Sequence, residues 1–318
     1  MDIKHLFATV SKPAKGPIAI EWIMLAYCAF TLVLAGCLWG DIETAPVINR
    51  IYILAATTAL WGLYQWRPCQ CFYLLRIFFQ IALLSYWYPD IYHYARLMPN
   101  TDHIFAMIDQ VIFGFQPSIL FSQTLSGFWW QELFNMGYFS YYMMIFTIVL
   151  WPLFKKDATL EYYACVIVCS FILFYTVFLF ILSAGPQFYF QHIGEDKALQ
   201  GIFPNVGDWF RYHPELVHNQ SADSGLFSYL VDRMQESEKP IAAFPSSHVG
   251  LSSIILALAW RLSRKLFWSL TPFYVILCAS TVYIGAHYAI DVVAGWILAL
   301  PIFFISNHIA KKLIRVAQ

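Results

Sequence analysis

The chain has 318 residues, of which 60% are hydrophobic, 19% aromatic and only 12% charged. A soluble domain of this size does not need so many apolar residues, whereas a protein that crosses a bilayer several times does. The formal net charge is zero, and nothing in the composition points to nucleic acid as a partner. We therefore expect an all-α fold, a polytopic bundle of membrane helices.

Eight apolar segments follow one another along the chain, and most approach the ~20 residues that a helix needs to cross a bilayer. They are residues 18–39, 50–66, 72–88, 132–151, 161–182, 246–261, 266–283 and 288–309. Since no repeat or low-complexity stretch separates them, we expect a single membrane domain over residues 1–318. Residues 1–70 would add a polar tail and two helices to a core formed by residues 71–318.

Basic residues are concentrated in the two terminal tails and in every second connection between these segments. They are Lys4, Lys12, Lys15, Arg67, Lys155, Lys156, Arg261, Arg264, Lys265, Lys311, Lys312 and Arg315. Because Lys and Arg are enriched in cytoplasmic connections, both termini are predicted to be cytoplasmic. Both a bacterial inner membrane and a eukaryotic endomembrane fit this pattern.

Two of the predicted non-cytoplasmic connections are long. The first, residues 89–131, has apolar residues at helical spacing, with Asp102 and Asp109 on the other face, which predicts a helix lying in the membrane interface. The apolar residues are Ile104, Met107, Ile108, Val111 and Ile112. The second connection, residues 183–240, is too long for a plain linker, so we expect it to form a non-cytoplasmic cap.

The stretch from Phe244 to Asp291 holds the residues with the clearest chemistry. After Pro245, Ser246 can cap a helix, and the amide groups that follow attract an anion. One apolar run down the membrane and one run back would return His287 to the level of His248. His287 and Asp291 are four residues apart, so on a helix they would touch, and the carboxylate could orient the imidazole.

A phosphate group above this helix end, flanked by two imidazoles, could be attacked by one while the other protonates the leaving oxygen. Ser246 and Ser247 would hold its oxygens, and Arg211 and Lys239 of the cap are the best candidates for further contacts with it. The alternative is that both histidines fill core positions. However, ionisable groups at membrane depth are costly and favour a functional explanation.

Other chemistries have less support in the sequence. A metal site would need more ligands than two histidines and one aspartate, and no Gly-x-Ser-x-Gly turn of a serine lipase occurs. We therefore expect no metal ion and no cofactor.

At these residues the chain resembles the type 2 phosphatidic acid phosphatase superfamily. The Pro-Ser-Gly-His signature appears as Pro245 to His248, with Ser247 in place of Gly. The Ser-Arg-x5-His-x3-Asp signature appears from Ser280 to Asp291, with Thr281 in place of Arg. In the Lys-x6-Arg-Pro signature, Leu60 stands in place of Lys before Arg67-Pro68.

These departures look more like the inositol phosphorylceramide synthase and sphingomyelin synthase branch, which shares a His…His-Tyr-x2-Asp pattern. Residues 113–117, the aromatic run 138–142 and Gly185-Pro186 are also similar to that branch. The resemblance implies a core of six helices. It also implies that His287 is the nucleophile of a phosphohistidine-type intermediate, that Asp291 orients it, and that His248 is the acid and then the base.

The leading hypothesis is a membrane phosphotransferase that moves a phosphorylated head group, such as phosphoinositol, from a phospholipid donor to a lipid or alcohol acceptor. The missing motif cations favour it, because a phosphodiester carries one negative charge fewer than a terminal phosphate. The alternative is a lipid phosphate phosphatase in which water resolves the same intermediate. A weaker alternative is a transporter or scaffold, which would predict inverted repeats or broken helices.

Overall fold

The computed structural model describes residues 15–154, 159–215, 225–236 and 238–317. Helices form at all eight predicted segments: α2 (Ala19–Cys37), α3 (Ala45–Trp66), α4 (Gln70–Asp90), α8 (Phe128–Leu150), α9 (Leu160–Phe178), α14 (Ser247–Leu262), α15 (Arg264–Tyr283) and α16 (Ala289–Ala317). The two long connections and the end of α8 add α5 (Tyr92–Ala95), α6 (Asp102–Phe113), α7 (Pro117–Thr124), η1 (Trp151–Phe154), α10 (Pro186–Ile193), α11 (Glu195–Leu199), α12 (Trp209–Tyr212) and α13 (Leu226–Gln235). Within the described ranges no strand forms, and an isolated bridge joins Asn100 to Leu182. The predicted all-α fold is confirmed.

In the described part of the chain, six helices are long and apolar enough to cross a membrane, or up to seven if the bent pair α6–α7 counts as one span. The six are α2, α4 continued to Ala95, α8 continued to Phe154, α9, α15 and α16. The other two predicted spans do not qualify, because α14 has only 16 residues and α3 contains polar residues such as Arg50 and Gln65. The chain is thus an integral membrane bundle with fewer clear spans than the eight predicted.

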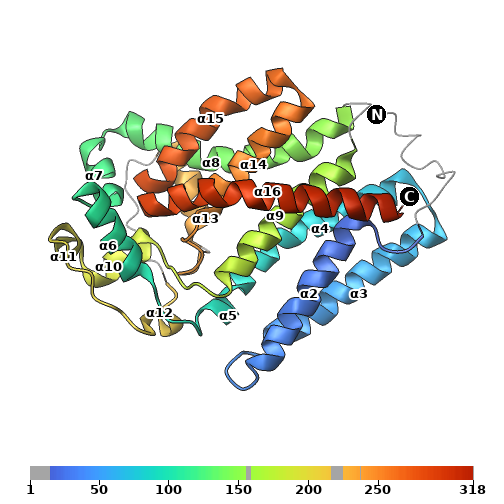
Figure 1. Ribbon diagram of the computed structural model, residues 1–318, viewed down its shortest axis with the longest axis horizontal. Coiled ribbons are helices and arrows are strands. Elements are labelled where there is room, and N and C mark those ends of the chain that lie inside the picture. Colours follow the sequence, from blue (N-terminus) through green and yellow to red (C-terminus); the bar gives the residue numbers. More distant parts are fainter. Residues whose placement is uncertain (1–14, 155–158, 216–224, 237, 318) are drawn as a thin grey trace.

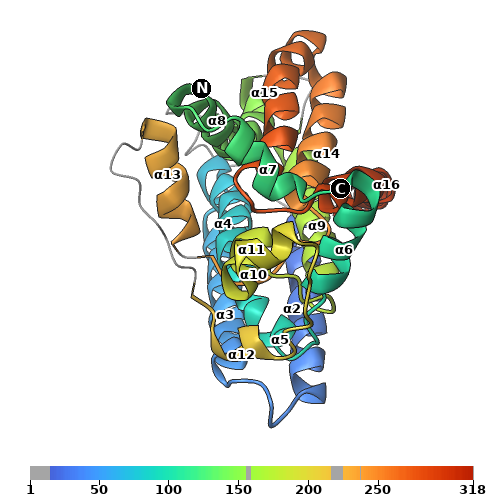
Figure 2. The same ribbon diagram turned by 90° about the vertical axis from the view of Figure 1, so that its left-hand side faces the viewer.

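The helices pack around α9. In α9, 72% of the apolar membrane-length stretch is buried inside the bundle. In each of the other five candidate membrane spans the buried share is 44% or less. Figure 1 shows α16 lying across α9 and α14, while α2, α3 and α4 form an N-terminal layer in which α2 and α4 pack against α9 and α3 packs on both of them. The antiparallel pair α14–α15 packs on α8, and in Figure 2 α10, α11 and α12 gather beside α6, away from the α14–α15 turn.

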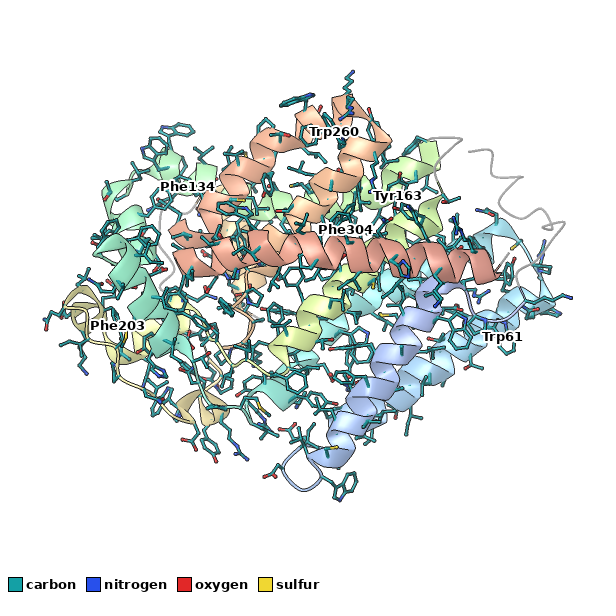
Figure 3. The ribbon with its side chains drawn as sticks, viewed as in Figure 1. Trp61, Phe134, Tyr163, Phe203, Trp260 and Phe304 are labelled. Carbon is teal, nitrogen blue, oxygen red and sulfur yellow. The ribbon has the colours of Figure 1, made fainter. Side chains whose placement is uncertain are left out.

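The outside of the bundle is apolar and aromatic. Trp61, Trp260 and Phe304 are 38%, 44% and 57% exposed and project outward in Figure 3. Because such residues are stable against lipid or at its interface, this surface suits a protein embedded in a membrane. Helix α6 likewise has its apolar side chains outside and its acidic ones inside: Met107 and Val111 face outward, while Asp102 and Asp109 are fully buried. The predicted division of its faces is therefore confirmed.

Charged side chains inside the N-terminal layer are paired. The Arg50 guanidinium makes a two-pronged contact with Asp90 at 2.9 and 2.6 Å, and it also donates to the Thr31 hydroxyl and the Pro46 carbonyl. Arg76 pairs with Glu21 at 2.5 Å. Arg50 is fully buried, so its charge belongs to the interior of the layer.

Some predictions fall on residues that the structure does not describe. Lys4, Lys12, Lys155 and Lys156, which enter the topology argument, lie outside the described residues, as do residues 216–224 and 237 of the predicted cap. The division of the chain into residues 1–70 and 71–318 stays a prediction.

Candidate functional site

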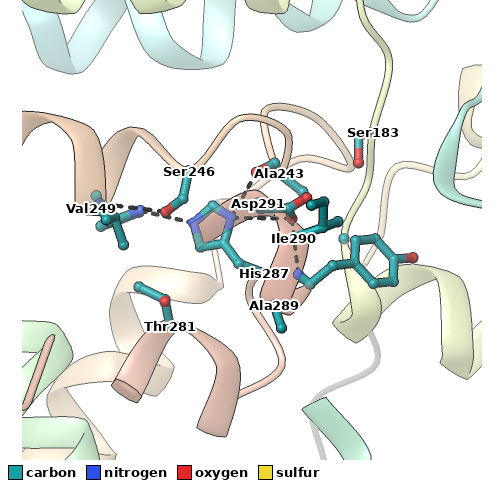
Figure 4. A network of polar contacts seen from close by, with 12 residues as sticks. Ser183, Ala243, Ser246, Val249, Thr281, His287, Ala289, Ile290 and Asp291 are labelled. Carbon is teal, nitrogen blue, oxygen red and sulfur yellow. Dashed lines mark hydrogen bonds and ion pairs between the residues drawn. The ribbon is translucent and has the colours of Figure 1, made fainter. Parts of the chain in front are cut away.

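Three segments meet where the candidate site lies (Figure 4). The first is the turn at residues 183–187, which opens the predicted cap; the second leads into α14 at residues 243–248; the third joins α15 to α16 at residues 284–291. Backbone hydrogen bonds hold them together: Ala243 N donates to Ser183 O at 3.0 Å, and Gln187 N donates to Gly285 O at 2.8 Å.

The two histidines are in direct contact. His248 lies in the first turn of α14, and His287 lies in the turn that follows α15, so the antiparallel pair brings them to one level. His248 Nδ1 is 3.2 Å from His287 Nε2, and the rings cross at 66°. His287 is only 3% exposed. Whether this pair carries out catalysis stays a prediction.

A backbone carbonyl sets the tautomer of His287. Its Nδ1 is 2.7 Å from the Ala243 oxygen, which can only accept, so Nδ1 carries the proton and Nε2 keeps its lone pair. Burial lowers the pKa of His287 to about 4, although the bond to Ala243 acts in the opposite direction. The ring is therefore neutral at physiological pH, which is the form that a nucleophile requires. In the contact between the rings, His248 Nδ1 is then the donor.

Asp291 lies close to His287 but in a different relation from the predicted one. His287 precedes α16 and is not part of it, so the expected pairing on one helical face does not form. Asp291 Oδ2 is 3.6 Å from His287 Nδ1 and accepts a 2.8 Å hydrogen bond from Tyr288 N. Among the described residues Asp291 Oδ1, which is buried, has no hydrogen-bond partner.

The predicted start of a helix at Ser246 is confirmed. Ser246 is the N-cap of α14, and its hydroxyl accepts from Val249 N at 3.4 Å. Ser246 N donates to Asp291 O at 3.0 Å, which ties this cap to the first turn of α16. Ser247 is 7% exposed. Phosphate binding by either serine stays a prediction.

The two cap cations lie in different surroundings. Arg211 is part of α12, and its guanidinium is 3.9 Å from the Asp41 carboxylate beyond α2. Lys239 lies four residues before Ala243 and forms no ion pair with any described residue. Thr281, which replaces the motif arginine, is buried and donates to the Cys278 carbonyl. In the described part of the chain no Lys or Arg side chain hydrogen-bonds to either imidazole.

The sequence did not identify the surroundings of His248. Tyr138 and Tyr141 of α8 place their rings 4.7 and 4.5 Å from its ring, and Tyr138 hydrogen-bonds to Glu238. Glu238 also accepts from Gln187 at 2.9 Å. Burial raises the pKa of Glu238, against these two hydrogen bonds, which lower it. The aromatic run at 138–142 was the available signal, but nothing linked it to a glutamate a hundred residues away.

Within the described residues, no group of three or more His, Cys, Asp or Glu side chains is arranged to hold a metal ion. A family model described as the PAP2 superfamily matches residues 103–305, which is well over half of the chain and includes both histidines and Asp291. The comparisons with curated proteins and with solved structures found no match.

Proposed function

Because this chain belongs to the PAP2 superfamily, a superfamily of phosphatases and phosphotransferases, we propose that it is a membrane phosphotransferase that transfers a phosphorylated head group between lipids. The observation that carries the proposal is the contact between His248 and His287 with the proton of His287 fixed on Nδ1. That arrangement supplies one neutral imidazole whose Nε2 keeps its lone pair, and a second imidazole that donates a hydrogen bond to that nitrogen.

The proposed reaction has two steps. First, His287 Nε2 attacks the donor phosphorus and forms a P–N bond, while the P–O bond to the diacylglycerol breaks and the leaving oxygen takes a proton from the protonated form of His248, which becomes neutral. Then His248 removes the proton from an acceptor hydroxyl, whose oxygen attacks the phosphorus and releases His287. Asp291, 3.6 Å from His287 Nδ1, would stabilise the positive charge that develops on the ring.

Charge around the histidines favours transfer of a phosphodiester over hydrolysis of a terminal phosphate. No described Lys or Arg bonds to either ring. A doubly charged phosphate would therefore lack a compensating cation, whereas a phosphodiester carries a single charge. We also propose that the termini are cytoplasmic and that the site faces the opposite side, as the basic connections predict.

The test is turnover by the purified protein in vesicles. One sample contains phosphatidylinositol and ceramide, and the other contains phosphatidic acid. A new phospholipid in the first supports the phosphotransferase, whereas release of inorganic phosphate in the second alone would make the protein a lipid phosphate phosphatase. Absence of both products would contradict the enzyme proposal and favour a transporter or scaffold.

A further inference from the structure

Helix α6 carries neither histidine, but its side chains hydrogen-bond to the residues that follow His287 and to the cap turn that packs against the residue before it. We propose that Asp102 and Asp109 of α6 are positioning residues that fix His287 and the first turn of α16 for the phosphoryl transfer. The inference rests on the proposed function, because it takes His287 as the reacting group. Neither aspartate is used by the two proposed steps.

Asp109 holds the beginning of α16. Its two carboxylate oxygens accept from Ala289 N at 2.8 Å and from Ile290 N at 2.9 Å, and the residue is fully buried. A helix leaves its first amides without partners, and they are usually satisfied by a residue directly before the helix. Here the partner comes from α6, 180 residues earlier in the chain. The first turn of α16, which includes Asp291, is therefore fixed to α6.

Asp102 holds the other neighbours of His287. It accepts from the Tyr288 hydroxyl at 3.1 Å and from the amides of Ala184 and Gly185 at 2.7 and 2.8 Å. The backbone at Gly185 has a φ of 89° and passes so close to Ala286 that a Cβ would lie 2.7 Å from its carbonyl oxygen. Because only glycine tolerates this conformation and approach, the cap turn is pressed against the residue before His287.

These bonds bear on catalysis because His287 lies in a turn and not in a helix. Besides the contact with His248, its own bonds are one from its amide to Thr281 O and one from Nδ1 to Ala243 O. The remaining constraint on its position comes from Ala286 and Tyr288, and both are held through α6. Burying two carboxylates is costly unless donors surround them, and here the donors are groups of the segments that flank His287 and of the cap turn.

The experiment compares variants of the full-length protein in vesicles. Asp109→Asn keeps the shape but offers one acceptor oxygen where two amides donate, so hydrogen exchange at residues 288–291 should speed up. The kcat should fall on the order of 10²-fold with an unchanged KM, because displacement by about 1 Å is enough for a loss of that size. Tyr288→Phe removes a single bond to Asp102, and its kcat should fall on the order of tenfold. Asp196→Asn, at an exposed acid of α11, is the matched control and should behave like the wild type.

Each outcome decides the inference. Faster exchange with an unchanged kcat in Asp109→Asn would make the contact purely structural and overturn the positioning role, and unchanged exchange would overturn the contact itself. If Asp109→Asn does not fold, Tyr288→Phe decides by the same two readouts. A wild-type protein without turnover overturns the proposed function, whereas an active wild type with equally active variants overturns only this inference.

Discussion

The N-terminal layer and the histidine site both bury ionisable groups, but they satisfy them differently. Arg50 has four hydrogen bonds, two of them to Asp90, so the protein itself supplies its partners. At the site, by contrast, Asp291 Oδ1 has no partner among the described residues, and His287 Nε2 is bonded only to the other imidazole. Buried polar groups are nearly always satisfied, so exceptions indicate where a ligand or a reaction completes the set. Arg76 Nη1 in the N-terminal layer also lacks a partner, so the open Asp291 Oδ1 points to chemistry only together with the histidine pair beside it.

The largest effect is expected at His287. His287→Ala should lower kcat by at least about 10⁴-fold, because it removes the proposed nucleophile. Loss of a ³²P-labelled, acid-labile phosphoenzyme should accompany it, while size-exclusion profile and melting temperature stay near those of the wild type. Retained turnover in this variant would refute the assigned nucleophile.

His248 should matter next. His248→Gln should lower kcat about 10³-fold with a natural donor, since general acid catalysis typically contributes 10² to 10⁴. With a synthetic nitrophenyl phosphodiester, whose leaving group needs no proton, the loss in the first step should be much smaller. Equal losses with both donors would argue against the role of His248 as the acid.

The pH dependence follows from the burial of His287. Its pKa is lowered to about 4, so the ring stays neutral, and the nucleophile active, until the pH falls through that value. The acidic limb of kcat/KM should therefore lie near pH 4, well below the limb near 6.5 that a histidine with the ordinary pKa would give. A phosphodiester substrate should be used for the profile, because it does not titrate in this range. An acidic limb centred near pH 6.5 would contradict the prediction.

A smaller effect is expected at Asp291. Asp291→Asn keeps an oxygen for Tyr288 N, and Ala243 O still fixes the His287 tautomer. The kcat should therefore fall only about tenfold, unlike the ~10⁴-fold loss when a carboxylate alone sets the tautomer. A loss as large as that would mean that Asp291, and not Ala243, orients the ring during turnover.

In the N-terminal layer the effect should be on stability alone. Arg50→Met leaves Asp90 buried without its cation and should cost about 3–5 kcal/mol of folding free energy, with kcat unchanged in the folded fraction. The double variant Arg50→Met/Asp90→Leu should recover most of the stability in thermal unfolding. A fall in kcat in the double variant would show that the two regions are coupled.

The sequence was sufficient for the features that depend on local patterns. Apolar runs of bilayer length predicted the helices, Ser246 after Pro245 predicted the start of α14, and the hairpin between the histidines predicted that they return to one level. Each of these follows from composition or spacing within a short stretch, which a single sequence displays directly.

The remaining features depend on contacts that leave no local mark. The acceptor for His287 Nδ1 is a backbone carbonyl, which any residue at position 243 would provide. The partner of Arg50 is 40 residues away, and the glutamate near Tyr138 is a hundred residues away. The prediction placed His287 and Asp291 on one helix. In the structure α16 begins at Ala289, two residues after His287, so the spacing of four residues did not determine their geometry.

The 3.2 Å separation of the two imidazoles has a consequence for substrates. Not even a single water molecule fits between those nitrogens, so a phosphorus atom can enter only if the rings are forced apart. The energy for this opening has to come from the parts of the lipid that do not react, chiefly its acyl chains. Donors with shortened tails should therefore be converted more slowly even at saturation, because a weakly held head group cannot keep the pair open.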